Sequence, residues 1–512
     1  MEPARMVRHA LLMMVGTCLS RVLGLAREMV TAAFFGASGQ LDAFNVAYTG
    51  ANLARQLLAE GALSAAFVPV FSRTLADGLP RAISLARQAL TVLIVASLGV
   101  TMLGIAAAPL LTFVMAPGFD VPTAALATHL TRWLFPFLFI ISLAALAMGV
   151  LNSMGSFFVP ALAPAFSNLA FIVSAPFLVG RFGVLGLAFS VLAGGFAHFF
   201  SQWLWGRRLG VTLLPERPDL SDPSLRRMMA LFLPYAAGLS LNQINPVISR
   251  MLGSFLEEGS ISVLNYANRV IQLPLGLFVI AVSQAVLPQL SRAAAHEDFL
   301  STLGDALRFA LFIVLPASLG LAVIAGPFVH LLFVRGAFGT WAWEATEAAL
   351  VLSVLGLPGM ACSTVVMRGL YALSMPREAF KTTLFSVACT AALSCALMFP
   401  MGYRGLALAP SVAFTLAGPL GLLYIRRKTA TFPSFPLRWI IKSALALAAM
   451  GTALILFRAS FPYDAGASAA LRTLWCLGAV LLGGSVYAAA TLSLRFDEWR
   501  WIKTAIAQKR TK

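Results

Sequence analysis

Segments of about 20 apolar residues recur from one end of this 512-residue chain to the other. An α-helix of that length crosses a hydrocarbon layer of roughly 30 Å. Only 11% of the residues are charged, whereas a soluble protein carries about 25%. Backbone polar groups in lipid must be satisfied within the chain, so we predict an all-α integral membrane protein. We delimit 14 transmembrane helices, at residues 10–35, 41–72, 88–115, 123–151, 158–180, 184–206, 228–256, 261–291, 306–334, 343–374, 379–400, 405–425, 438–458 and 470–494.

The net charge of +17 is compatible with nucleic-acid binding, but the placement of the charges argues against it. If the N-terminus is cytoplasmic, the inner loops and tails hold 25 of the 37 Lys and Arg residues and the outer loops hold 5. Such a bias follows the positive-inside rule. We therefore expect an N-in/C-in topology and no nucleic-acid partner.

The chain also contains an internal repeat. LSAAFVPVFSR (63–73) resembles VSQAVLPQLSR (282–292), and GVLGLA (183–188) resembles GYRGLA (402–407), both at an offset of 219 residues. The offset predicts two six-helix repeats, helices 1–6 and 7–12. Because six is an even number, both copies have the same orientation in the membrane, so we predict parallel repeats with a substrate site between them. We predict an N-terminal lobe at 1–217, a second lobe at 218–430, and two last helices with a basic cytoplasmic tail at 431–512.

Several predicted helices carry ionisable residues at depths where a lipid-facing helix is neutral. Such residues usually face a partner or a water-filled cavity. Among these ionisable residues, arginines outnumber acidic residues, so we predict a cationic central cavity that suits an anion. Phosphate fits in particular, because the planar guanidinium of arginine binds it through two hydrogen bonds. The alternative is that these residues form internal salt bridges. Two other arginines, Arg132 and Arg368, lie near helix ends, where long side chains snorkel to the interface. The set comprises Arg21, Arg27, Arg55, Arg250 and Arg269 with Glu28, Asp42 and Glu60.

The stretch SLNQINP (240–246) predicts a kinked helix at Pro246, with polar side chains that satisfy freed backbone groups or contact substrate. The five histidines are scattered, and the five cysteines lack metal-site spacing. No set of residues suggests catalysis. We therefore expect that the protein is not an enzyme and has no metal and no cofactor. We expect its driving force to be the membrane potential or an ion gradient.

Several motifs resemble the MurJ/MviN family, bacterial lipid II flippases of the multidrug/oligosaccharidyl-lipid/polysaccharide exporter superfamily. They are SRVLGLARE (20–28), DAFNVAYTGANLARQLLAEGALSAAFVPVF (42–71), APGF (116–119), VLNSMGSFFVPALAPAFSN (150–168) and NYANRVIQLPLG (265–276). The resemblance covers essentially the whole chain. It implies a bacterial inner-membrane location, alternating access through a cationic cavity, and a lipid-tail groove at the last two helices.

The same resemblance implies a set of substrate-handling positions. Asn268 and Gln272 stand beside Arg269 where many members have acids, which puts proton coupling through those positions in doubt. To the matched positions we add Asn52 and Arg250, with Gly24 and Pro246 as conformational residues. The substrate-binding set is Ser20, Arg21, Arg27, Asp42, Asn52, Arg55, Glu60, Arg250, Ser262 and Arg269.

We accordingly predict a flippase that moves lipid II, the undecaprenyl-pyrophosphate-linked peptidoglycan precursor, from the cytoplasmic to the periplasmic leaflet. The expected partners are lipid II, membrane lipids and the cell-wall synthesis machinery. Two alternatives are a flippase for another polyprenyl-linked oligosaccharide and a non-transporting scaffold of that machinery. A drug or cation antiporter fits less well, because a cationic substrate requires an acidic cavity.

Overall fold

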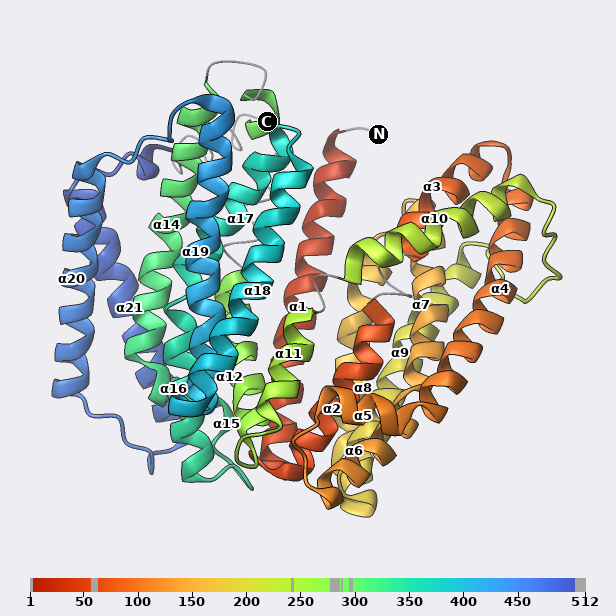
Figure 1. The fold of residues 1–512 in the computed structure, drawn as a ribbon, viewed down its shortest axis with the longest axis horizontal. Helices are drawn as coiled ribbons and strands as arrows, with labels where there is room; N and C mark the ends of the chain where they lie inside the picture. Colours follow the sequence, from red (N-terminus) through yellow and green to blue (C-terminus); the bar gives the residue numbers. More distant parts are fainter. Residues whose placement is uncertain are drawn as a thin grey trace. The chain divides into compact units, whose positions relative to one another are not determined.

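The computed structural model describes residues 3–56, 63–240, 244–276, 286, 289–293 and 298–501. Regular structure in these ranges is helical (Figure 1), which confirms the predicted class. Ten helical stretches among the described residues are long and apolar enough to cross a membrane. The predicted segments 10–35, 41–72, 228–256 and 261–291 are not among these ten, and the last three include residues outside the described ranges. The number 14 therefore stays a prediction.

The chain divides into two compact units, Met1–Ser262 with Arg335–Phe338, and Val263–Val334 with Gly339–Lys512. This division assigns residues 218–262 to the first unit, whereas the lobe boundary predicted from the repeat lies at 217/218. The first unit holds α1 (Pro3–Phe35), α2 (Gly39–Ala54), α3 (Leu63–Ala76), α4 (Leu79–Ala106), α5 (Ala108–Met115), α6 (Val121–Leu134), α7 (Pro136–Ser153), α8 (Phe158–Phe182), α9 (Leu185–Arg208), α10 (Pro223–Ser240) and α11 (Ile244–Gly253).

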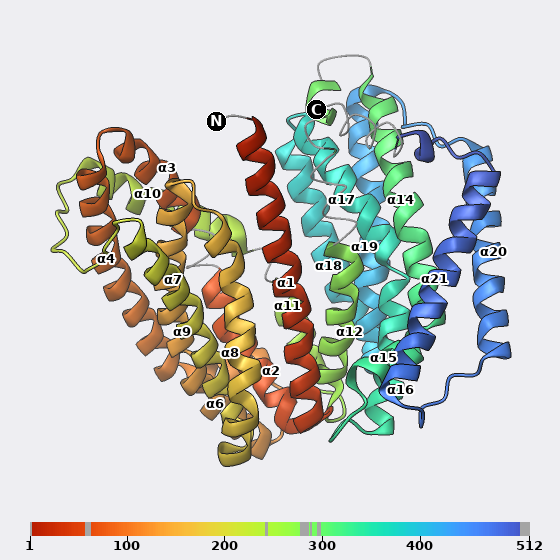
Figure 2. The same cartoon turned by 180° about the vertical axis from the view of Figure 1, so that it is seen from behind.

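Helix α12 (Ser260–Pro274) begins at the end of the first unit. The second unit continues with α14 (Phe299–Val323), α15 (Ala325–Phe333), α16 (Thr340–Val354), α17 (Leu357–Ala372), α18 (Pro376–Met401), α19 (Tyr403–Thr429), α20 (Leu437–Ser460) and α21 (Ala469–Ser493). Within this unit, α20 and α21 lie side by side in both views (Figures 1 and 2).

A short turn that begins at Gly36 joins α1 to α2. Gly36 has a φ of +58°, the left-handed region that glycine enters without a Cβ penalty. The Ser38 side chain then accepts a hydrogen bond from the Leu41 N–H at 3.4 Å and caps α2. Glycine ends the first helix and serine starts the second.

At least four of the predicted single spans, 88–115, 123–151, 306–334 and 343–374, are each divided into two helices. The span 123–151 corresponds to α6 and α7, with Phe135 between them, and Pro136 lies in the first turn of α7. The span 343–374 is divided in the same way into α16 and α17, and Pro358 lies in the first turn of α17. Proline is favoured there because first-turn N–H groups have no intrahelical acceptor.

The sequence repeat is reproduced in the backbone of one helical hairpin. Gly183, between α8 and α9, has φ +57° and ψ −138°. Gly402, between α18 and α19, has φ +56° and ψ −135°. The Gly183 N–H donates to the Val179 carbonyl at 2.8 Å, and the Gly402 N–H donates to the Met398 carbonyl at 2.9 Å. The two turns thus share one conformation at the predicted offset.

A second glycine in each hairpin brings two backbones close together. A Cβ on Gly186 would lie 2.4 Å from the Leu178 carbonyl oxygen, and a Cβ on Gly405 would lie 2.3 Å from the Leu397 carbonyl oxygen. Only a residue without a side chain fits at such a separation. This pair also follows the 219-residue offset.

The ends of α7 and α17 repeat another turn. The Ser156 N–H donates to the Leu151 carbonyl and the Met375 N–H donates to the Leu370 carbonyl, both at 2.9 Å. In the turn that follows α17, Ser374 has a φ of +56°, and the corresponding residue after α7 is a glycine, Gly155. These hydrogen bonds close the last turn of each helix in the same left-handed motif.

The polar segment that links α9 to α10 is fastened to α4. Thr91 Oγ1 donates to the Glu216 carbonyl at 2.6 Å and accepts from the Glu216 N–H at 3.0 Å. Ser84 donates to the Glu216 carboxylate at 2.7 Å, and the Asp219 N–H donates to Gln88 at 3.0 Å. These α4 residues lie at three- and four-residue spacings, which places them on one helix face. Beyond the linker, α10 runs across α3 (Figure 1).

In the second unit, α20 and α21 are packed to each other and to α14. Tyr487 on α21 donates to the Phe312 carbonyl of α14 at 2.9 Å. A Cβ on Gly483 would lie 3.2 Å from Met450 on α20. Gly483 therefore serves helix packing.

Candidate functional site

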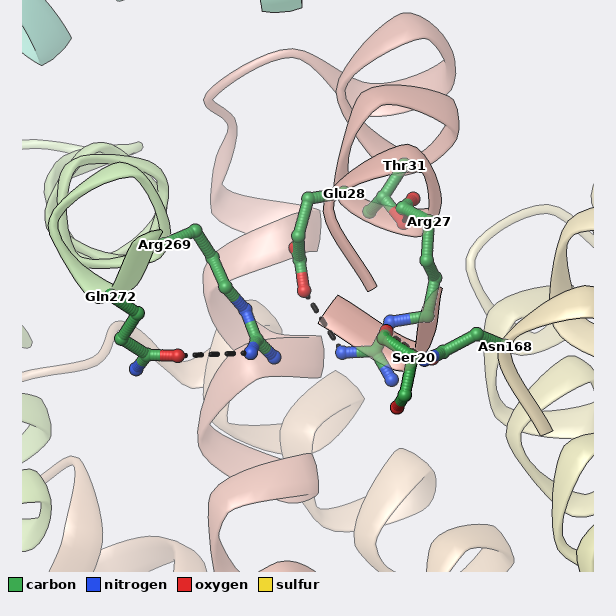
Figure 3. Close-up of polar contacts among 7 residues, drawn as sticks. All are labelled: Ser20, Arg27, Glu28, Thr31, Asn168, Arg269 and Gln272. Carbon is green, nitrogen blue, oxygen red and sulfur yellow. Dashed lines mark hydrogen bonds and ion pairs between the residues drawn. The ribbon is translucent and has the colours of Figure 1, made fainter. Parts of the chain in front are cut away.

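Arg27 and Glu28 form an ion pair in the second half of α1. Arg27 Nη2 lies 2.9 Å from Glu28 Oε1 (Figure 3), and the two side chains are 17% and 7% exposed. One turn later, Thr31 donates to the Arg27 carbonyl at 3.0 Å. An arginine at the centre of a bilayer costs about 3 kcal/mol on insertion scales. The neighbouring carboxylate reduces that cost.

Two aromatic rings from other helices lie against the Arg27 guanidinium. Its Cζ is 5.6 Å from the ring centroid of Tyr48 on α2 and 5.5 Å from that of Phe171 on α8. Both distances fall within the range of about 6 Å for a cation–π contact. Tyr48 is itself stacked on Phe44 and tilted against Phe137. Arg27 is thus held at a point where three helices meet.

Small residues of α1 bring this helix close to α8, the helix that carries Phe171. A Cβ on Gly16 would lie 3.0 Å from the Ala161 carbonyl oxygen. Asn168 Nδ2 donates to the Ser20 carbonyl at 3.1 Å (Figure 3) and would lie 3.6 Å from a Cβ on Gly24. Residue numbers rise together in these pairs, so α1 and α8 run parallel. Small residues every fourth position permit such close packing in membranes.

Asp42, in the first turn of α2, accepts three hydrogen bonds at the start of α12. Its carboxylate accepts from the Gly259 N–H at 2.8 Å, from the Ser262 N–H at 2.7 Å and from Ser262 Oγ at 2.6 Å. Asp42 is 3% exposed and Ser262 is fully buried. The first N–H groups of a helix have no intrahelical acceptor and favour a negative charge. Asp42 supplies that acceptor from another helix.

Asn45, Thr49 and Arg250 extend this contact along α2. Asn45 Nδ2 donates to Ser262 Oγ at 3.2 Å, and Thr49 donates to the Asn45 carbonyl at 2.6 Å. From α11, Arg250 donates to Thr49 Oγ1 at 3.3 Å and to the Ile261 carbonyl at 3.2 Å. One polar network therefore joins α2, α11 and the first turn of α12.

Arg55 and Asn52 form a separate contact at the end of α2. Arg55 Nε donates to Asn52 Oδ1 at 2.9 Å. The buried His198 on α9 lies within electrostatic range of Arg55. Glu60, predicted as a substrate-binding residue, lies outside the described residues.

Three further predicted residues are described individually. Arg21 on α1 is half-buried. In the second unit, Arg269 on α12 is half-buried and donates to Gln272 Oε1 at 3.4 Å (Figure 3). Pro246 lies in the first turn of α11, and residues 241–243 of the stretch that predicts a kink lie outside the described part of the chain.

The structure thus brings several of the predicted residues of the first unit into three groups, around Arg27, Asp42 and Arg55. Sequence reasoning did not identify Tyr48, Phe171 or Asn168 as parts of the Arg27 group, although Asn168 ends one of the motifs that carry the family resemblance. It also omitted Asn45 and Thr49. Their positions three and seven residues after Asp42, on the same helix face, provide a signal that finds them.

The chemistry of these groups suits an anion rather than a metal ion. The described residues contain no group of three or more His, Cys, Asp or Glu side chains that would hold a metal. A guanidinium, by contrast, offers planar donors that match phosphate oxygens. Arg27, Arg55 and Arg269 each have a polar side-chain partner that a phosphate can replace.

Comparison with known proteins gives consistent matches. A family model described as lipid II flippase MurJ matches residues 31–473. The probable lipid II flippase MurJ of Vibrio cholerae is 31% identical over 513 residues, which cover 96% of each chain. The lipid II flippase MurJ of Burkholderia cenocepacia is 34% identical over 439 residues, 83% of this chain and 85% of that protein.

Solved structures agree with these sequence matches. A lipid II flippase MurJ in an inward closed conformation has a TM-score of 0.79 at 27% identity and covers 95% of this chain and 99% of its own. An inward-facing MATE family transporter of the MOP superfamily has a TM-score of 0.69 at 17% identity, over 80% of this chain and 94% of its own, and shares the fold.

These matches extend over most of the chain. With ten helical stretches in the described part of the chain that can cross a membrane, they make it a multi-pass protein of the bacterial inner membrane. The chain belongs to the lipid II flippase MurJ family.

Proposed function

We propose that this protein moves lipid II from the cytoplasmic to the periplasmic leaflet of the inner membrane. The observation that carries the proposal is the buried Arg27–Glu28 pair of α1 in a chain of the MurJ family. A membrane protein rarely retains an ion pair of this kind without a function, because its desolvation is costly. An anionic lipid headgroup that must cross the hydrocarbon layer explains the presence of the arginine.

The pyrophosphate of the headgroup is the part that arginine recognises. In the proposed mechanism Arg21, Arg27 and Arg269 bind the phosphate oxygens while the prenyl chain stays in the lipid. Arg27 exchanges the Glu28 carboxylate for phosphate, so its charge has a partner in both states. The remaining predicted positions, Ser20, Asn52, Arg55, Glu60 and Arg250, belong to the same proposed path.

Alternating access through a cationic central cavity is the proposed route, with lobes at 1–217 and 218–430 and two further helices at 431–512. The turns that repeat at Gly183 and Gly402 support two copies of one unit. Six helices per copy would give the copies the same orientation, as in other parallel-repeat transporters. The proposed topology has 14 spans with both termini in the cytoplasm, in accordance with the positive-inside rule.

Asp42 and Ser262 are proposed to act in this cycle through their contact, which fastens the first turn of α12 to α2. Gly24 and Pro246 are proposed as positions where α1 and α11 change conformation. Gly24 lies where α1 approaches α8 closely. Because glycine has no side chain, α1 can slide against α8 at this position.

The proposed driving force is the membrane potential or an ion gradient, without a cofactor. Outward movement of an anion is favoured by an inside-negative potential, by about 2.3 kcal/mol per charge per 100 mV. Proteoliposomes that contain lipid II and a potassium diffusion potential test this directly. Equal rates with and without the potential would contradict the electrical part of the proposal.

Rescue of cells depleted of their own lipid II flippase tests the function itself. We expect the wild-type chain to restore growth and cell shape. If it moves a different polyprenyl-linked oligosaccharide, it will fail to rescue these cells although it is present in the membrane. If it is a scaffold, Arg27→Ala and Arg269→Ala will rescue as well as the wild type does, which would contradict a transport function.

A further inference from the structure

The Arg27 group contains a feature that an ion pair alone does not require. One carboxylate, Glu28, is sufficient to stabilise a buried guanidinium, yet Tyr48 and Phe171 also contact the guanidinium of Arg27. The two rings come from helices α2 and α8, which are far apart in sequence. We propose that Tyr48 and Phe171 are positioning residues that keep the Arg27 guanidinium in place while it exchanges Glu28 for a phosphate of the substrate.

The physical basis is the difference between a carboxylate and an aromatic face. A carboxylate stabilises the guanidinium but neutralises it and occupies its N–H donors. An aromatic ring attracts the cation through its quadrupole and leaves the charge and the donors at the edge of the guanidinium in place. An arginine held by rings therefore remains able to bind a second anion.

The surroundings of each ring support a fixed position. Tyr48 is stacked on Phe44 with ring centroids 6.0 Å apart and an interplanar angle of 12°. Phe171 is 3% exposed on α8, one turn after Asn168. Asn168 holds the same helix to α1 through the Ser20 carbonyl at 3.1 Å. Both rings are therefore anchored independently of the arginine.

A long, flexible arginine loses side-chain entropy when it is ordered, and each of its partners must compensate for that loss. If Glu28 alone ordered Arg27, release of Glu28 would also release the guanidinium. With two rings in contact, the guanidinium keeps its place when the carboxylate leaves, and the incoming phosphate meets a preorganised donor set. The inference rests on the proposed function, because it concerns the same arginine and the same headgroup.

The test measures binding of lipid II and of undecaprenol, which has no phosphate, to purified full-length protein in nanodiscs. Phe171→Leu removes the ring but keeps an apolar side chain. We expect its affinity for lipid II to fall roughly tenfold, the size of one desolvated cation–π contact. The affinity for undecaprenol should stay unchanged, so the preference for the charged lipid declines.

Three further variants separate positioning from general damage. Phe177→Leu is the matched control, since Phe177 lies on the same helix and is 77% exposed. Phe171→Trp keeps an aromatic face and should retain wild-type discrimination. Tyr48→Leu should repeat the loss. If Phe171→Leu does not fold, Tyr48→Leu provides the same test.

The outcomes are distinct from those of the proposed function. If the wild type binds lipid II no better than undecaprenol, the proposed function fails. If the wild type discriminates and Phe171→Leu and Tyr48→Leu discriminate equally well, the positioning role is wrong and the proposed function stands. Equal loss in Phe171→Leu and Phe177→Leu would also overturn the positioning role.

Discussion

The Asp42 carboxylate accepts hydrogen bonds from both the backbone N–H and the hydroxyl of Ser262, at 2.7 and 2.6 Å. A buried aspartate is stable in this place because it completes the N-terminus of a helix that starts more than 200 residues later in the chain. Asp42, predicted as a substrate contact, thus has a structural partner of its own.

Removal of the Asp42 carboxylate is predicted to cost more than removal of the Ser262 hydroxyl. Asp42→Ala leaves two buried N–H groups of the α12 start without an acceptor, which costs about 1–3 kcal/mol for each. Ser262→Ala removes one donor to Asp42 and the acceptor of Asn45 Nδ2, but it leaves both backbone contacts of Asp42 in place. Thermal unfolding in detergent should therefore show a clearly lower midpoint for Asp42→Ala. Equal midpoints would show that the α12 N–H groups do not depend on Asp42.

The repeated hairpin turns allow a prediction with its own internal control. Gly183→Ala and Gly402→Ala place a side chain in a conformation that essentially only glycine adopts, at a cost of about 1–3 kcal/mol, with no atom within 4 Å of the new Cβ. Because the two turns share one conformation, the two losses should be alike.

Gly186→Ala and Gly405→Ala should be more damaging than the turn variants. Their new Cβ atoms meet backbone at 2.4 and 2.3 Å, so the paired helices must separate. Yield of folded protein and unfolding midpoint measure the difference. A Gly186→Ala variant as stable as Gly183→Ala would contradict the close approach of α8 and α9.

Fastening of the linker to α4 is predicted to depend on Thr91. Thr91→Val keeps the shape of the side chain but removes both hydrogen bonds to the Glu216 backbone. Hydrogen exchange at residues 209–222 should accelerate, because local opening becomes easier. The matched control is Thr101→Val on the same helix, since the Thr101 hydroxyl is buried without a hydrogen-bond partner. Thr101→Val should leave the linker unchanged, and an equal effect of both variants would refute the role of Thr91.

The fold class follows from sequence because it depends on local composition and on the length of apolar segments. The turn at Gly36 and the repeat at Gly183 and Gly402 were also predictable, since glycine marks positive φ and the two motifs are alike. The division of one predicted span at Phe135 was not foreseen. The signal was present in Pro136, but an apolar run that long also fits one continuous helix.

The surroundings of Arg27 were less predictable. Sequence spacing reports which residues share one helix face, and it identified the charged residues of α1. The rings of Tyr48 and Phe171 come from two other helices, and their contact with Arg27 depends on how α1, α2 and α8 pack. Packing partners of this kind are encoded by the whole unit and by no single stretch of the chain.

The central claim is that Arg27 handles the phosphate of a lipid headgroup during transport. The most direct measurement is the rate of lipid II translocation in proteoliposomes for wild type, Arg27→Lys and Arg132→Lys. Arg27→Lys keeps the charge but loses the planar fork, and the rate should fall at least about tenfold, as expected for loss of one charge-assisted hydrogen bond. Arg132 is exposed on α6, and Arg132→Lys should match the wild type. Equal rates for all three proteins would contradict the account.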